Sequence, residues 1–278
     1  MVHRLAPAFA AVSLAPLLLQ AAPAAAQDEP IGLADDPFQI TNPRVSSPGE
    51  VGLAVIGSYD RARRGRTRDT LGAETEVAFG VLPKLELRFG QAGAYGNLDV
   101  RRRLDIVGPE GGSRPNRGGV TQFGALYQFT QERGALPVVG VLGRVRLLYG
   151  PGRPAREVEA VALVGKTVLG GERPLGVYLN VGWTMRLDPL PGERTDRYLV
   201  NASVGQTVSH DTALVATYIR EQQERGNRDY SLVQAGVRQR LPAWATTFGL
   251  ALGVGTNRDS PRFQAAFAFQ WSFGGGGR

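Results

Sequence analysis

Charged, amide and phenol side chains recur at alternate positions in several otherwise apolar segments of this 278-residue chain. Alternate side chains of an extended strand point to one face, so these groups would gather on one side of a sheet. Such a set could line a pore and select polar or anionic solutes, or it could fill a narrow barrel interior with ion pairs. Because arginines outnumber acids in the set, an open pore would favour anions. The predicted lining residues are Glu76, Glu86, Arg88, Gln122, Arg144, Arg146, Tyr178, Asn180, Arg186, Arg238 and Arg240.

A second set of basic residues is concentrated in a polar stretch, within a chain of formal net charge +7. The run could steer anionic solutes towards a pore, or it could bind phosphates of outer-membrane lipid and lipopolysaccharide. We favour the lipid contact, because steering requires a matching open pore. No aromatic and basic recognition module accompanies the run, so no nucleic-acid partner is predicted. The predicted extracellular basic rim consists of Arg61, Arg63, Arg64, Arg66 and Arg68.

Catalytic chemistry has little support in the sequence. His210 is the only histidine beyond the N-terminal segment, and it lies between Ser209 and Asp211. Three consecutive residues in a tight turn cannot converge on one proton-transfer geometry. With no cysteine and one histidine, neither thiolate chemistry nor a transition-metal site is expected. The acids at 188, 193 and 196 could bind calcium, although such a cluster is typical of a solvated loop. We therefore predict no enzyme activity, no metal and no cofactor.

The elements that would position these side chains are short alternating segments. In the last of them, the aromatic residues from Phe263 to Phe273 share one face and Gln264 and Gln270 share the other. The pattern predicts an all-β fold, a transmembrane antiparallel up-and-down β-barrel of about twelve strands with apolar residues facing lipid. The predicted strands are 49–60, 73–81, 85–95, 119–130, 136–149, 158–168, 175–186, 197–208, 212–223, 229–241, 246–256 and 262–273.

The connections between these segments alternate between short turns and longer polar loops, as in outer-membrane barrels. Two segments do not fit simple alternation. In 158–168, Glu159 and Lys166 fall on opposite faces, and in 212–223 both faces are mixed. A β-bulge would reconcile either segment.

The N-terminus is typical of an exported protein. A basic start, an apolar run and Ala24 to Ala26 before Gln27 predict a signal peptide over 1–26. Residues 27–48 contain several prolines and would form a periplasmic arm or a plug in the lumen. The barrel would span 49–273, followed by a Gly-rich tail over 274–278. The predicted location is the outer membrane of a Gram-negative cell.

Several stretches of the barrel also resemble a known family. They are "ETEVAFGVLPKLELRFG", "VTQFGALYQFTQE", "LPVVGVLGRVRLLYGPG", "GVYLNVGW" and "RFQAAFAFQWSF". The pattern is similar to outer-membrane proteins of the "MetA-pathway of phenol degradation" family. This resemblance implies an outer-membrane barrel that acts as a channel or transporter and carries no catalytic residues.

One departure from outer-membrane barrels lies at the C-terminus. Such barrels usually end on an aromatic residue that the assembly machinery recognises, whereas Gly274 to Arg278 follow Phe273 here. Trp271 and Phe273 could still serve this recognition.

The sequence thus predicts a channel for passive uptake or efflux of a small anionic or aromatic solute. A closed structural or surface-interaction barrel is the alternative, followed by an outer-membrane hydrolase.

Overall fold

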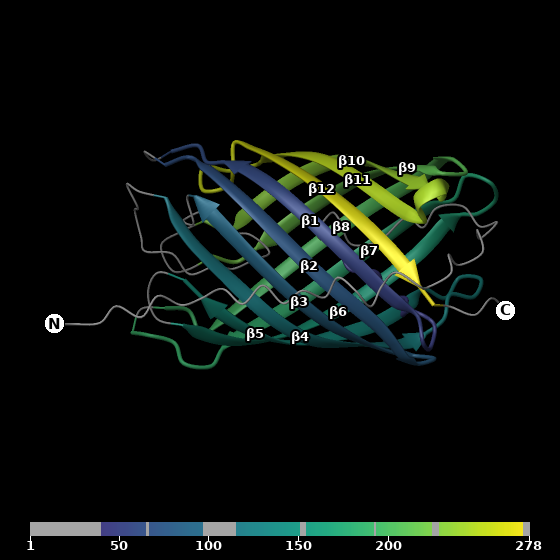
Figure 1. The fold of residues 1–278 in the computed structure, drawn as a ribbon, viewed down its shortest axis with the longest axis horizontal. Coiled ribbons are helices and arrows are strands. Elements are labelled where there is room, and N and C mark those ends of the chain that lie inside the picture. The colour runs from purple at the N-terminus through teal and green to yellow at the C-terminus, as the bar shows by residue number, and fades with distance from the viewer. Residues whose placement is uncertain are drawn as a thin grey trace.

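Twelve antiparallel strands form a closed barrel, with the strands tilted against its long axis (Figure 1). The computed structural model describes residues 40–64, 67–96, 115–150, 154–191, 193–223 and 228–274. The predicted signal peptide, Arg66 and most of the Gly-rich tail lie outside these ranges. The strands are β1 Val51–Arg61, β2 Asp69–Leu82, β3 Leu85–Gly96, β4 Asn116–Thr130, β5 Val138–Tyr149, β6 Ala155–Leu169, β7 Leu175–Arg186, β8 Asp196–Ser209, β9 Thr212–Glu221, β10 Tyr230–Leu241, β11 Thr246–Gly255 and β12 Phe263–Phe273.

Each strand pairs with its neighbours in sequence, and the first and last strands close the barrel. The closing register runs without interruption from Val51 opposite Phe273 to Arg61 opposite Phe263. Figure 1 shows β1 and β12 side by side along the front of the barrel. One short helix, η1 Pro242–Trp244, lies in the turn between β10 and β11. Among the described residues, no helix has the length and apolar character needed to cross a membrane.

Alternation along the strands sorts side chains between the two surfaces as predicted. In β12, Phe263 and Phe267 are exposed on the outside, whereas Gln264, Ala266 and Ala268 are buried inside. The predicted outward positions of β2 to β4, such as Val77 and Phe89, are likewise exposed. An apolar exterior around a largely polar interior is the arrangement of a barrel whose outer surface faces lipid.

Several strands begin earlier than the sequence indicated, always at the end nearest a long loop. Strand β2 starts at Asp69, β4 at Asn116 and β6 at Ala155, whereas the predicted starts were 73, 119 and 158. These extensions contain polar residues, so their sequence resembles that of a loop. Their backbones nevertheless continue the ladder, and Glu157 pairs with Arg186 of β7.

The two bulges suggested for the irregular segments are absent at those places. Between Glu159 and Lys166 the register of β6 with both neighbours is continuous, and the shift lies beyond them, between Thr167 and Leu169. Lys166 lies on the outward face near the strand end, where its stem can lie along the wall while its ammonium reaches polar partners. Strand β9 alternates regularly. Its faces looked mixed because Val215 and Ile219 point inward although they are apolar.

Apolar side chains fill part of the interior. Leu126, Leu142, Val161 and Leu163 form one buried cluster, and Val45 packs against it from inside the barrel. Further clusters join Val120 with Leu148, and Ile219 with Tyr230 and Leu232. Small barrels commonly fill their interior in this way. The lumen is therefore divided into apolar patches and a polar network.

Candidate functional site

All the predicted lining residues lie at inward positions of their strands. Seven of them are buried, namely Glu76, Glu86, Gln122, Arg146, Asn180, Arg186 and Arg238. The other four, Arg88, Arg144, Tyr178 and Arg240, are half-buried. Most of the set lies on β2 to β5 and β7, while Arg238 and Arg240 lie apart on β10.

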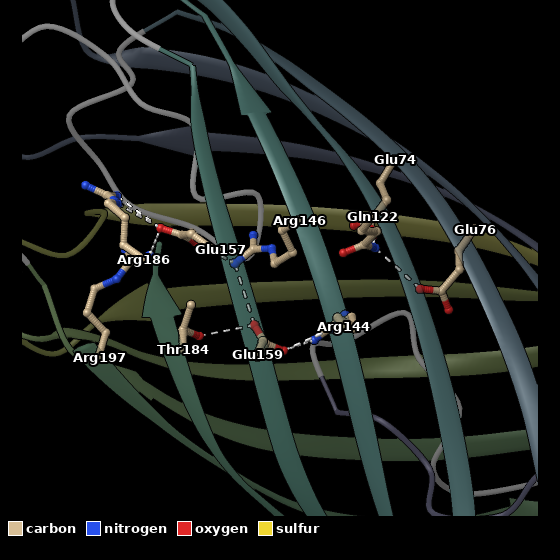
Figure 2. Close-up of polar contacts among 10 residues, drawn as sticks. All are labelled: Glu74, Glu76, Gln122, Arg144, Arg146, Glu157, Glu159, Thr184, Arg186 and Arg197. Carbon is tan, nitrogen blue, oxygen red and sulfur yellow. Dashed lines mark hydrogen bonds and ion pairs between the residues drawn. The ribbon is translucent and has the colours of Figure 1, made fainter. Parts of the chain in front are cut away.

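One carboxylate on β6 gathers arginines from three other strands. Glu157 is fully buried and accepts hydrogen bonds at Oε1 from Nη2 of Arg186 over 3.0 Å and of Arg197 over 2.6 Å. Nη1 of Arg146 lies 3.5 Å from its Oε2. Figure 2 shows these side chains converging on Glu157 from β5, β7 and β8. Removing one partner from such a buried group would leave uncompensated charge, at a cost of about 3–5 kcal/mol.

The next inward carboxylate of β6 has a similar set of partners. Glu159 accepts hydrogen bonds from Nε and Nη2 of Arg144 and from Oγ1 of Thr184. Its Oε2 also lies 3.6 Å from Nη1 of Arg146. Arg146 thus links the two carboxylates (Figure 2), and β5 to β8 carry one continuous ion-pair network.

A second network follows β2, β3 and β4. Arg88 donates from Nε to Glu86 over 2.7 Å and from Nη1 to Glu76 over 3.2 Å. Gln122 donates from Nε2 to Glu74 over 3.1 Å and to Glu76 over 3.5 Å. The predicted neighbours Glu76, Glu86 and Arg88 therefore do meet.

Sequence reasoning missed five members of these networks, among them Glu74 and Thr184, which were not assigned to the inner face. Glu157 fell in a predicted loop, Arg197 stood at the first position of a predicted strand, and Glu159 was left unassigned. Each of them occupies an alternate position that shares the inward face of its strand, and this alternation was the signal that could have found them. With these acids present, the inward arginines are matched by carboxylates. The excess of positive charge on which the predicted anion preference rested is absent from this part of the lumen.

A small, partly open cavity of about 50 Å³ lies within the first network. Its walls come from β5 to β9, and Thr41 of the N-terminal segment also lines it. The polar side chains at its surface include Arg144, Glu159, Asn180 and Asn201. A cavity of this size holds a few water molecules or a very small polar solute.

Residues Ile40–Pro48, termed here the lumen segment, lie against the inner face of the barrel. Ile40 and Thr41 are buried. The backbone of Thr41 hydrogen-bonds the side-chain amide of Asn180 when that amide is oriented to match it. Because Asn180 belongs to the inner face of β7, this contact places the start of the segment within the lumen.

The lumen segment then crosses several strands of the wall. The backbone N–H of Val45 donates to Gln128, and Ser46 donates from both its N–H and its hydroxyl to Oε2 of Glu86, each over 2.7 Å. Glu86 is also the partner of Arg88. The lumen segment is therefore joined directly to the β2–β4 network.

Glu132 also holds the lumen segment, and it lies in the turn between β4 and β5. It accepts hydrogen bonds from Arg44 over 2.7 Å, from Lys166 over 2.8 Å and from the backbone and hydroxyl of Thr167. Partial burial alone would raise the pKa of Glu132, but these hydrogen bonds from Lys166, Thr167 and Arg44 lower it below its usual value. We call these four residues the Glu132 cluster.

The remaining predicted groups lie near the ends of the barrel. Arg240 lies 3.8 Å from Asp211 in the β8–β9 turn, where the exposed ring of His210 also contacts Asp211. Of the predicted rim, Arg61, Arg63, Arg64 and Arg68 are exposed. Arg63 donates to the carbonyl of Gly255 over 2.6 Å, which ties the first long loop to the end of β11.

The three acids considered for calcium do not gather around a common point. Asp188 pairs with Arg156, and Glu193 pairs with Arg186 at 3.2 Å. Within the part of the chain that the structure describes, no group of three acids or histidines is arranged to hold a metal ion.

Comparisons with known proteins bear on the fold. No protein-family model matches the sequence, and no curated protein matches it. The structure is similar to that of an outer membrane channel from Pseudomonas putida F1, with a TM-score of 0.55 and 12% identity over 86% of this chain and 100% of that chain. The translocator domain of the autotransporter NalP from Neisseria meningitidis has a TM-score of 0.49 and 11% identity over 82% and 89% of the two chains. At 12% identity the likeness to the outer membrane channel concerns architecture alone: the chain folds as a closed barrel of the outer-membrane type.

Proposed function

We propose that the protein is an outer-membrane channel for a small solute, and that the lumen segment obstructs it in the state described. The observation that supports this proposal is that the twelve strands close on one another without the lumen segment. The segment is held in the lumen mainly by contacts with wall side chains, such as those of Glu86 and Gln128. It could therefore leave without breaking the barrel.

The proposed location and partners follow from the fold and from the sequence motifs. A signal peptide over 1–26 would export the chain, and the final strand would be recognised by the barrel-assembly machinery. The exposed apolar exterior would contact outer-membrane lipid, and the basic rim would contact lipopolysaccharide phosphates.

The chemistry of the solute follows from the lining. The resemblance to the "MetA-pathway of phenol degradation" family suggests an aromatic compound. The described lumen, however, presents paired charges and amides, which suit a polar solute better. We propose that transport through the barrel is passive.

A closed structural barrel is the second candidate. It is favoured by the apolar clusters, in which Val45 of the lumen segment packs against Leu126 and Val161. In that case the lumen segment would be a permanent part of the core.

Planar-bilayer conductance separates the two. The mature protein from Gln27 would be compared with a variant that lacks residues 27–48, each shown by heat-modifiable gel migration to have folded. A channel predicts small or rare openings for the mature protein and larger, sustained openings for the deletion variant. The absence of conductance from both folded proteins would refute the channel proposal.

A further inference from the structure

The lumen cavity combines charges of both signs within one small space. Arg144 and Arg146 reach it from β5 and Arg197 from β8, while Glu159 of β6 and Glu221 of β9 supply the acids. Thr41 of the lumen segment closes one side. The cavity therefore lies between the lumen segment and the strand ends that carry the long loops.

The charges around the cavity balance. Arg144 pairs with Glu159, and Arg146 and Arg197 both contact Glu157, which lies behind the cavity wall. Arg186, the third partner of Glu157, also pairs with Glu193. Together with Glu221, which lines the cavity, four carboxylates therefore stand beside four arginines. A solute with a net charge would bring an uncompensated charge into this buried place, which is unfavourable. A solute that carries one positive and one negative charge would add no net charge to the cavity.

We propose that this cavity is a binding site for a small zwitterion that carries a carboxylate and an ammonium group, such as an amino acid with a minimal side chain. This inference rests on the proposed channel function and names its solute class. The carboxylate would accept hydrogen bonds from the arginines, and the ammonium would donate to Glu159 or Glu221. Asn180 and Asn201 offer further polar atoms.

The size of the cavity agrees with this class. An engineered cavity that binds benzene has a volume of about 150 Å³ and an apolar lining. The present cavity is about 50 Å³, partly open and lined by charged and amide groups. This lining disfavours an aromatic hydrocarbon and can form hydrogen bonds with a zwitterion of a few heavy atoms.

Isothermal titration calorimetry of the refolded mature protein in detergent micelles tests the site. Glycine, acetate and methylammonium are of similar size and differ in charge. We expect saturable glycine binding, with acetate and methylammonium at least about tenfold weaker because each lacks one charge-assisted set of hydrogen bonds. Acetate binding as tightly as glycine would overturn the proposal, and so would the absence of saturable heat with every probe.

A double variant locates the site. Arg144→Gln with Glu159→Gln removes a complete ion pair at the cavity, so no unpaired partner remains in that pair. Arg156→Gln with Asp188→Asn is the control, because this ion pair also joins two strand ends but lies outside the cavity lining. Glycine affinity should fall at least about tenfold in the first variant and stay unchanged in the second. Equal losses in both would contradict the assignment.

A gentler substitution covers the case in which the double variant fails to fold. Asn201→Leu keeps the ion pairs and replaces one amide at the cavity with an apolar group of similar size. It should weaken glycine binding severalfold, and unchanged affinity would count against the site. Conductance measured in parallel separates the two proposals, because a channel that conducts but does not bind glycine refutes only the zwitterion site.

Discussion

At the scale of single residues, Glu132 connects three parts of the molecule through one carboxylate. It belongs to the β4–β5 turn and accepts hydrogen bonds from Arg44 of the lumen segment and from Lys166 and Thr167 of β6. Its lowered pKa means that the folded protein favours the ionised form. Such a group stabilises the fold above its unfolded pKa, and this stabilisation is lost as the pH falls through the lower folded value.

Replacing this carboxylate by an amide should therefore destabilise the barrel in a pH-dependent way. At pH 7 we expect Glu132→Gln to lose about 1.5–3 kcal/mol of folding free energy, the range for hydrogen bonds to a charged group. The difference from the unmodified protein should shrink once the pH is below 4.5, the usual value for this group, and approaches the folded pKa. Urea unfolding in lipid vesicles, followed by heat-modifiable gel migration, measures both effects.

The matched control for this substitution is Glu172→Gln. Glu172 lies exposed in another short turn, between β6 and β7. It should change the unfolding midpoint very little at any pH. Equal effects of the two substitutions would show that the Glu132 cluster does not stabilise the fold.

At the scale of elements, the lumen segment and the wall are fitted closely together. A Cβ atom added at Gly80 of β2 would lie 2.1 Å from the carbonyl oxygen of Ser47, which is far inside van der Waals contact. The same addition at Gly52 of β1 would meet Ala78 at 3.6 Å, an ordinary contact. The two glycines therefore make a matched pair of test positions.

Gly80→Ala should push the lumen segment off the wall, whereas Gly52→Ala should not. Overpacking of this kind costs about 1–3 kcal/mol, so trypsin should cleave after Arg44 roughly tenfold faster in Gly80→Ala. Mass spectrometry of the peptides released from the refolded proteins gives this rate. The same cleavage rate in both variants would mean that the segment is not held against β2.

The elements were more predictable from the sequence than the contacts between them. All twelve strands follow from alternation and from the short and long connections, because both are local properties of the chain. The shared partner of Arg146 and Arg197 was missed, because Glu157 lies in a strand extension whose sequence resembles a loop. The inward orientation of the apolar residues of β9 was also not predicted, because alternation alone assigns apolar side chains to the outside.

At the scale of the whole molecule, the exposed apolar residues form a band around the barrel. Leu252 lies near the middle of β11 and is 52% exposed, while Leu190 in the β7–β8 connection is 44% exposed. The two leucines are similarly accessible, but only the first would lie within the hydrocarbon of a bilayer.

An arginine at each position tests this orientation. Leu252→Arg should cost about 2–4 kcal/mol of folding free energy in phosphatidylcholine vesicles, because it places a charge at mid-membrane depth. Leu190→Arg should cost almost nothing. Urea titration of folding into vesicles measures both, and similar losses for the two variants would contradict a membrane-spanning band.

Three glycines of the inner wall determine where bare backbone would line an open channel. Pro43 lies close to Gly140 and Gly165, and Ser47 lies over Gly80, so at these three points no wall side chain lies opposite the lumen segment. If the segment withdrew, bare backbone would be uncovered at these points, near the end with the short turns. Arg144, Arg146 and Glu159 lie towards the other end, on β5 and β6, and would remain in place. Withdrawal of the segment would also remove Thr41 from the cavity lining, so unplugging would change the site that selects the solute.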